Sequence, residues 1–378
     1  MLNGENIEKC IWNASLGKRN RSDVKWVLEH IDEVVLQIQE TVTDGSYYEK
    51  LPHHVPFLIN DGVSRKKRWI IKPNFNEQIV HHMLVSVSKD IIMQGMYELS
   101  CGSIPGRGGI YAKERVEKYI KKHQKDNKIN YCLKLDVKHF FQSVSHTKLK
   151  KLISKHIKDQ LVCDVYFAII DAYEDHHDEV TGERYGIPIG FYTSQWLANW
   201  YLQGLDHYIK EDLKAGFYAR YMDDMVIFGE TSKELHEMKE KIEEYLNNVC
   251  DLELNKKWQV FKFDSRKSKS KKGRCLDFVG FRFFRDRTIL RKNLMLKGTR
   301  KARKIFKQKD CNWYEATQLL SSLGWFHKSD TKYCFKKYIK PYVYVNSLKH
   351  KVSKHKRKLN QEKIIDLNKV LEERRKVA

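Results

Sequence analysis

Three aspartates are the residues of this sequence best suited to chemistry. Asp136 follows the alternating run YCLKL, and the pair Asp223–Asp224 interrupts the apolar segment FYARYMDDMVIF. Nucleotidyl transfer to a growing strand uses two divalent cations about 4 Å apart. Magnesium is a hard cation that prefers oxygen ligands, so carboxylates are the appropriate side chains. The three aspartates would form such a site if their two segments were neighbours in the fold.

The YxDD pattern is only moderately specific by itself. It arises by chance on the order of once per ten thousand positions, so about one chain in twenty to thirty of this length contains it accidentally. An acidic pair is also a common composition at the tip of a hairpin. The order and spacing of the surrounding segments therefore have to decide whether YMDD is part of a catalytic site.

The segments around the aspartates have the patterns of strands. Residues 131–137 alternate, with Leu135 on one side and Asp136 on the other. Residues 217–228 predict a β-hairpin with the acidic pair at its tip. Further strands are expected at 252–255, 258–263 and 276–284, and helices at 146–159, at 161–173 and along the aromatic stripe from Trp196 to Ile209.

Apolar spacing predicts three more helices. The first places Val24, Val27, Leu28, Ile31, Val35 and Ile38 on one face, with Ser22 as its N-cap. The second follows Pro73, and the third follows the hairpin with Leu235, Met238, Ile242, Tyr245, Leu246 and Val249 inward. Residues 100–112, SCGSIPGRGGIYA, are predicted to form a glycine-rich loop whose backbone can approach a ligand closely.

Composition points to a polyanionic partner. The 378 residues have a formal net charge of +23, and 41% are hydrophobic, which is enough for a packed interior. Such a charge favours nucleic acid, or less strongly an anionic membrane, over a merely lysine-rich surface. The eight cysteines are scattered and form no CxxC pair, which indicates reduced thiols. With no signal peptide and no membrane span apparent, a cytoplasmic protein is expected.

Seven short motifs follow one another in an order that resembles the reverse transcriptases. They are RWIIKPNFNEQIVHHML, SIPGRGGIYA, LKLDVKHFFQSV, IPIGFYTSQ, YMDD, LELNKKW and DFVGFRFF. SSLGWFHKSDTKYCFKKYI after them resembles the thumb of bacterial members. The resemblance extends over residues 65–345. It implies an RNA-directed DNA polymerase, with Asp136, Asp223 and Asp224 as its catalytic residues.

The resemblance also implies roles for individual residues. Asp136, Asp223, Asp224 and Val137 would bind two Mg²⁺ ions, with Mn²⁺ as an alternative. Phe141 would collide with a 2′ hydroxyl, and Lys256 or Lys257 would protonate the leaving pyrophosphate. The residues expected at the nucleotide are Arg68, Lys72, Phe141, Ile189, Gly190, Gln195 and Lys257. Those expected at the template or primer are Arg107, Gly108, Tyr221, Met222 and Gly280.

The fourth motif points to one clade. Its IGxxxSQ form, Ile189 to Gln195, is similar to the reverse transcriptases of diversity-generating retroelements, which copy a template RNA with frequent errors opposite adenine. Ile189 stands where the QGxxxSP form has a polar glutamine, so looser positioning of the nucleotide is one hypothesis for the errors. A packed core isoleucine is the other interpretation. A retron-like or phage-defence enzyme, or an inactive RNA-binding relative, is the alternative.

The fold implied is α+β, a right-hand polymerase with fingers, an antiparallel-sheet palm and a helical thumb. We expect an N-terminal extension at 1–66, fingers and palm at 67–290, and a basic helical thumb and tail at 291–378. The basic loop 264–274 and the thumb would contact nucleic acid. The partners implied are template RNA, primer and cDNA, deoxynucleoside triphosphates and a small basic oligomeric accessory protein, without a membrane.

Overall fold

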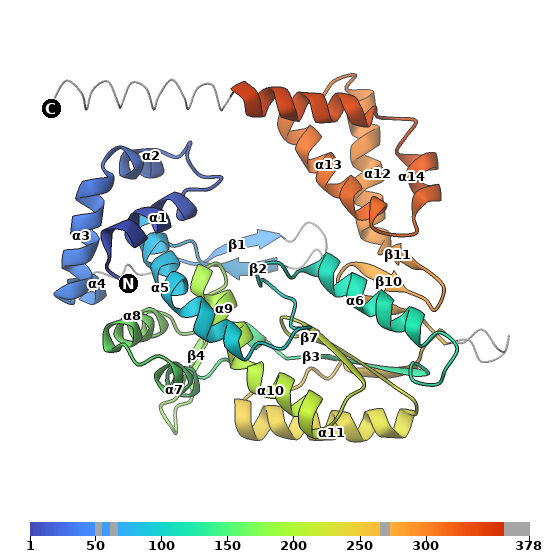
Figure 1. Cartoon of the computed structure of the whole chain (residues 1–378), viewed down its shortest axis with the longest axis horizontal. Helices are drawn as coiled ribbons and strands as arrows, with labels where there is room; N and C mark the ends of the chain where they lie inside the picture. The colour runs from blue at the N-terminus through green and yellow to red at the C-terminus, as the bar shows by residue number, and fades with distance from the viewer. Residues whose placement is uncertain (50–54, 61–66, 265–272, 359–378) are drawn as a thin grey trace. The chain divides into compact units, whose positions relative to one another are not determined.

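The computed structural model describes residues 1–49, 55–60, 67–264 and 273–358 (Figure 1). Backbone contacts divide the chain into two compact units, Met1–Arg274 and Cys275–Ala378. The domain boundaries expected from the sequence, 1–66, 67–290 and 291–378, remain predictions. Most of the predicted basic loop, 265–272, lies outside the described residues. The α+β class expected from the sequence is confirmed, because helices surround sheets whose strand pairs are antiparallel.

The main sheet of the first unit has the strand order β6-β7-β3-β8. Its strands are β3 (Tyr131–Asp136), β6 (Phe217–Tyr221), β7 (Asp224–Gly229) and β8 (Gln259–Lys262). Strands β6 and β7 are buried along nearly their whole length, which explains their continuous apolar runs. Helix α6 contacts β6, and helix α11 contacts β3, β7 and β8. The sheet is thus held in place by helices.

The other elements of the first unit are mostly helical. The helices are α1 (Gly4–Ala14), α2 (Ser22–Glu29), α3 (Ile31–Thr43), α4 (Ser46–Glu49), α5 (Phe75–Gln94), α6 (Gly109–Lys122), α7 (His146–His156), α8 (Gln160–Asp171), α9 (Tyr192–Tyr201), α10 (Gln203–His207) and α11 (Ser232–Cys250). A 3₁₀ turn, η1, spans Phe140–Gln142, and a π-helical turn, η2, spans Tyr208–Asp212. Two hairpins are formed by β1 (Phe57–Asn60) with β2 (Lys67–Ile70) and by β4 (His176–His177) with β5 (Arg184–Tyr185).

Helix α5 is buried along much of its length. Its N-cap Asn74 follows Pro73 and accepts a hydrogen bond from the backbone of Glu77 (2.8 Å), so the predicted start after Pro73 is confirmed. The helix packs against α1 and α9, which explains why apolar residues occur on most of its sides. It therefore joins the N-terminal segment to the body of the first unit.

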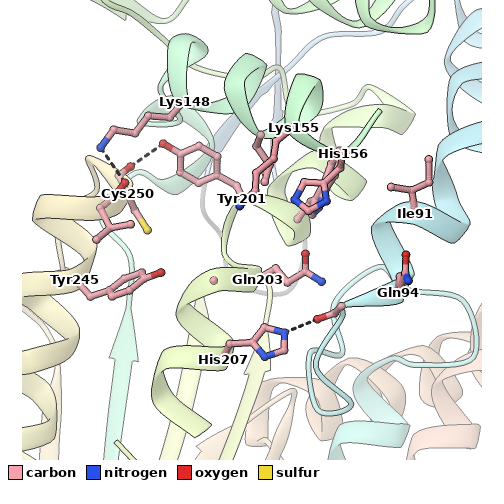
Figure 2. A pocket seen from close by; sticks show the side chains of 15 residues that line it. Ile91, Gln94, Lys148, Lys155, His156, Tyr201, Gln203, His207, Tyr245 and Cys250 are labelled. Carbon is pink, nitrogen blue, oxygen red and sulfur yellow. Dashed lines mark hydrogen bonds between the residues drawn. The ribbon is translucent and has the colours of Figure 1, made fainter. Parts of the chain in front are cut away.

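Hydrogen bonds join the helices around a cavity of about 730 Å³ in the first unit (Figure 2). Tyr201 Oη donates to the carbonyl of Cys250 (2.7 Å), and Lys148 Nζ donates to that of Val249 (2.8 Å). His207 Nε2 donates to the carbonyl of Gly95 (2.8 Å). These bonds connect α9 and α7 to the end of α11, and α10 to the turn after α5. None of the cavity's lining residues is a predicted site residue.

The second unit combines a small sheet with helices. Its sheet has the order β11-β10-β9, from β9 (Leu276–Phe278), β10 (Phe281–Phe283) and β11 (Thr288–Leu290). The helices are α12 (Lys292–Lys307), α13 (Trp313–His327) and α14 (Lys332–Tyr338), and residues 345–358 are also helical. A capping box between Asn312 and Glu315 fixes the start of α13.

Two predicted elements are divided in the structure. The single helix expected from Val24 to Ile38 is α2 and α3, which meet at His30, and Ser22 lies inside α2 instead of capping it. The apolar pattern continues across this break because both helices bury their apolar residues, so the pattern alone does not reveal where one helix ends. The strand expected at 276–284 is β9 and β10, joined by a turn in which Val279 and Gly280 have positive φ values of 43° and 86°.

Smaller corrections concern segment ends. Residues 109–112 of the predicted loop are the first turn of α6. Residues 252–255 form only an isolated bridge, between Leu254 and Val137, instead of a strand. Val249 is exposed, because Cys250 takes the inward position at the end of α11. The predicted helix from Trp196 to Ile209 is interrupted after Tyr201 and ends in the π-helical turn.

The remaining expectations concern cysteines and membranes. No cysteine is joined to another, and six of the eight are buried; the reduced state of the thiols stays a prediction. Within the described ranges, no helix is long and apolar enough to cross a membrane.

Candidate active site

The sheet register brings the segments of the three aspartates together. Asp136, the last residue of β3, lies directly opposite Asp224, the first residue of β7. Tyr221 pairs with Asp224 across the β6–β7 hairpin, so its turn consists of Met222 and Asp223. The condition set out above, that the two segments be neighbours, is met, because β3 pairs with β7. One detail of the predicted hairpin was wrong, since Asp223 alone lies in the turn and Asp224 already belongs to β7.

The carboxylates strongly influence one another. Burial and the neighbouring negative charge of Asp136 raise the pKa of Asp223 to about 7. Asn255 Nδ2 donates a hydrogen bond to Asp136 Oδ2 (3.0 Å), and Lys134 Nζ lies 3.2 Å from Asp224 Oδ2. A divalent cation would relieve the repulsion, and the oxygen donors suit Mg²⁺. In the described part of the chain, no group of three or more acidic, histidine or cysteine side chains has a geometry that could hold a metal ion.

A buried ion pair holds the hairpin turn. Arg220 and Asp206 are both fully buried, with Nε 2.7 Å from Oδ1 and Nη2 2.5 Å from Oδ2. Arg220 Nη1 also donates to the carbonyl of Met222 (3.0 Å), inside the turn that contains Asp223. Tyr218 Oη donates to Asp206 Oδ1 (2.7 Å). A charged network beneath the sheet thus fixes the backbone next to the catalytic candidate.

The glycine-rich segment lies against the same turn. Cys101 N donates to the carbonyl of Arg220 (2.8 Å), so the segment runs beside β6. A Cβ atom at Gly102 would lie 2.6 Å from the backbone nitrogen of Met222, which only glycine avoids. Asn199 Nδ2 donates to the carbonyl of Gly102 (2.8 Å). The backbone of this segment therefore approaches Met222 closely, while the predicted approach to a ligand stays a prediction.

The first and fourth motifs also meet. Ile71 N donates to the carbonyl of Ile189 (2.9 Å). Gly190 has a φ of 123°, and a Cβ there would lie 2.0 Å from the carbonyl oxygen of Ile71. Ile189 itself is half-buried, so it is not a fully packed core residue, and Gln195 and Lys72 are exposed. The IGxxxSQ segment is thereby fixed next to the strand that contains Arg68.

The other predicted residues are distributed around these segments. Phe141 is half-buried beside Phe140, with ring centres 5.6 Å apart, and Val137 is buried. Lys256 and Lys257 are exposed just beyond Asn255, and Arg68 is exposed on β2. Arg107 Nη1 donates to the carbonyl of Tyr97 (2.7 Å), and Gly108 precedes α6. Gly280 belongs to the second compact unit.

Sequence reasoning missed the residues that support the site. Arg220 occurs within an apolar strand, where a fully buried charge requires a partner. The sequence alone therefore indicates that Arg220 needs a partner. It does not indicate that the partners are Asp206 and Asn199, because these contacts depend on tertiary packing. Asn255 lies in the LELNKKW motif, directly before the two lysines for which the sequence predicts a role.

Residues 61–283 match the reverse transcriptase (RNA-dependent DNA polymerase) family. The chain belongs to this family. Solved structures similar to it include the telomerase of Candida albicans in complex with a TWJ fragment of telomeric RNA, at 13% identity and a TM-score of 0.47, covering 78% of this chain and 58% of that one. Apo telomerase of Candida tropicalis is similar at 14% identity and a TM-score of 0.47, covering 72% and 51%. The chain thus spans little more than half the length of these telomerases.

Proposed function

We propose that this member of the reverse transcriptase family is an active RNA-directed DNA polymerase. Asp136, Asp223 and Asp224 would hold two Mg²⁺ ions, which Mn²⁺ can replace. The observation that supports this most strongly is the register that puts Asp136 opposite Asp224, with Asp223 in the adjoining turn. A protein that only binds RNA gains nothing from clustered carboxylates, which repel phosphate unless cations neutralise them.

The chain's own residues prepare the reaction. When bound, the cations activate the primer hydroxyl and hold the triphosphate. Asn255 orients Asp136, Lys134 neutralises part of Asp224, and Arg220 fixes the carbonyl of Met222 beside Asp223. Lys257 is exposed near this edge and is our candidate to protonate pyrophosphate, while Phe141 would exclude a 2′ hydroxyl.

Primer extension on a mixed-sequence RNA template with Mg²⁺ tests the activity. Asp223→Ala should abolish extension and keep RNA affinity, whereas Asp90→Ala, at an exposed aspartate on α5, should change neither. Equal extension by the wild type and Asp223→Ala would refute the assignment. Wild-type protein that binds RNA but extends no primer, even with the neighbouring gene's product added, would favour the inactive RNA-binding alternative.

We further propose that the enzyme serves a diversity-generating retroelement, in the cytoplasm. The support is the IGxxxSQ form of the fourth motif and the half-buried position of Ile189, whose carbonyl is bonded to Ile71. An apolar side chain there leaves the incoming nucleotide without an amide contact. Template RNA, a primer, deoxynucleoside triphosphates and a small basic oligomeric accessory protein are the partners of this proposal.

Sequencing of the cDNA tests the retroelement assignment. The wild type should misincorporate preferentially opposite adenine, and Ile189→Gln should reduce those errors, because the amide restores a polar contact. Ile189→Val, which stays apolar, is the matched control and should remain error-prone. Faithful wild-type products would move the enzyme to a retron-like or phage-defence clade without affecting the polymerase assignment.

A further inference from the structure

The positive charge of the chain is concentrated in its second compact unit. Residues 275–378 contain 28 lysines and arginines against 9 acidic residues, whereas residues 1–274 contain 43 against 39. The unit that contains the three aspartates is therefore close to neutral by formal charge. Most of the attraction for a polyanion must come from the C-terminal unit.

Exposed aromatic side chains accompany this charge. Trp313 is 44% exposed, Tyr314 56% and Tyr344 83%. The Trp313 ring stacks on His355, with centroids 4.0 Å apart and planes only 10° from parallel. Large rings left in water contribute little to a core, but they provide faces on which unpaired bases can stack.

The stacked pair lines a hollow of about 770 Å³. Lys354 and Arg357 also line it, and no carboxylate does. Among the residues described, neither cation has an ion-pair partner. A second hollow, of about 550 Å³, is lined by Phe306, Tyr344 and Lys307 among others. Lys351 lines both hollows, so they are neighbours on one surface.

We propose that this surface, formed by the end of α12, the start of α13 and residues 342–358, binds single-stranded RNA. Bases would stack on Trp313 and its neighbours, and phosphates would pair with Lys354 and Arg357. A duplex is a poor occupant because its bases are already stacked within the helix. The choice of RNA over single-stranded DNA rests on the proposed function, but the binding itself does not require the aspartates.

Fluorescence anisotropy of the full chain with a labelled, unstructured 20-nucleotide RNA tests the proposal. Trp313→Ala should raise the dissociation constant for the RNA at least fivefold, because stacking of a base on an aromatic ring contributes substantially to the free energy of binding. His355→Ala, on the other side of the stack, should act in the same direction. Trp26→Ala is the matched control: Trp26 is 45% exposed and stacks on His30, but it belongs to the near-neutral unit. Its RNA affinity should match the wild type.

Charge and catalysis can be separated in the same assay. In the double variant Lys354→Gln with Arg357→Gln, the slope of log K against log salt concentration should become less steep by about one to two. Asp223→Ala should bind the RNA normally, so loss of polymerase activity would leave the proposal standing. Unchanged affinity in both Trp313→Ala and His355→Ala would overturn it. So would tighter binding to a hairpin duplex, to single-stranded DNA or to anionic phosphatidylserine vesicles than to the single-stranded RNA.

Discussion

Asp206→Asn should destabilise the protein sharply, because it removes the charge that compensates buried Arg220. Both side chains of the pair are fully buried, and two contacts of 2.7 and 2.5 Å join them. Removing one partner of such a pair costs about 3–5 kcal/mol, since the remaining charge stays buried. A domain is stable by only about 5–15 kcal/mol, so this loss is large.

Urea unfolding followed by circular dichroism measures the loss. The double variant Asp206→Leu with Arg220→Met removes both charges, and it should be more stable than Asp206→Asn alone. A loss below about 1 kcal/mol for Asp206→Asn would refute the reasoning about the buried charge. A double variant that is less stable than Asp206→Asn would also refute it.

The same network should influence the hairpin turn. Arg220→Met removes the hydrogen bond to the carbonyl of Met222, next to Asp223. We expect primer extension by the folded double variant to be slower at saturating nucleotide, while its RNA affinity is retained. Unchanged extension would mean that the turn keeps its geometry without Arg220.

Two further predictions concern stability. Gly190→Ala should reduce the free energy of unfolding by about 1–3 kcal/mol or more and so lower the thermal midpoint, because the φ of Gly190 is 123° and an added Cβ would lie 2.0 Å from Ile71 O. Gly324→Ala is the control: this glycine has open space around it, so the variant should be as stable as the wild type or more so. Equal midpoints for the two variants would contradict this reasoning. Burial and the charge of Lys18 lower the pKa of His82 to about 4, so the unfolded chain binds this proton first as pH falls. The wild type should therefore lose more stability between pH 6.5 and pH 4 than His82→Phe, which keeps the stack on Tyr192, and parallel unfolding curves would refute that assignment.

The sequence was sufficient to predict the strands that contain the three candidate aspartates. Alternation in YCLKLD predicted one strand, and the two apolar runs around Asp223–Asp224 predicted a hairpin; all three strands are observed. The patterns did not predict that β3 pairs with β7. The strands themselves could be predicted because local backbone pattern and buried face coincide in them. The same holds for the helix after Pro73, whose start is determined by a proline and a capping asparagine.

The remaining features depend on contacts between distant segments. Nothing near Arg220 in the sequence indicates that its partner is Asp206, because that pairing requires α10 to pack under β6. The approach of Gly102 to Met222 likewise depends on where the glycine-rich segment is placed. The break at His30 and the turn at Val279–Gly280 interrupt apolar patterns that continue on both sides. Periodicity records which face is buried, and it does not record where the chain turns.

The most direct test of the carboxylate site is to count bound Mn²⁺ by electron paramagnetic resonance. The sample would contain the full chain, a primer on RNA template and a non-hydrolysable deoxynucleotide analogue. We predict two ions for the wild type and for Asp90→Ala, and loss of at least one for Asp223→Asn. Equal Mn²⁺ binding by the wild type and Asp223→Asn would contradict the assignment of these aspartates as the metal site.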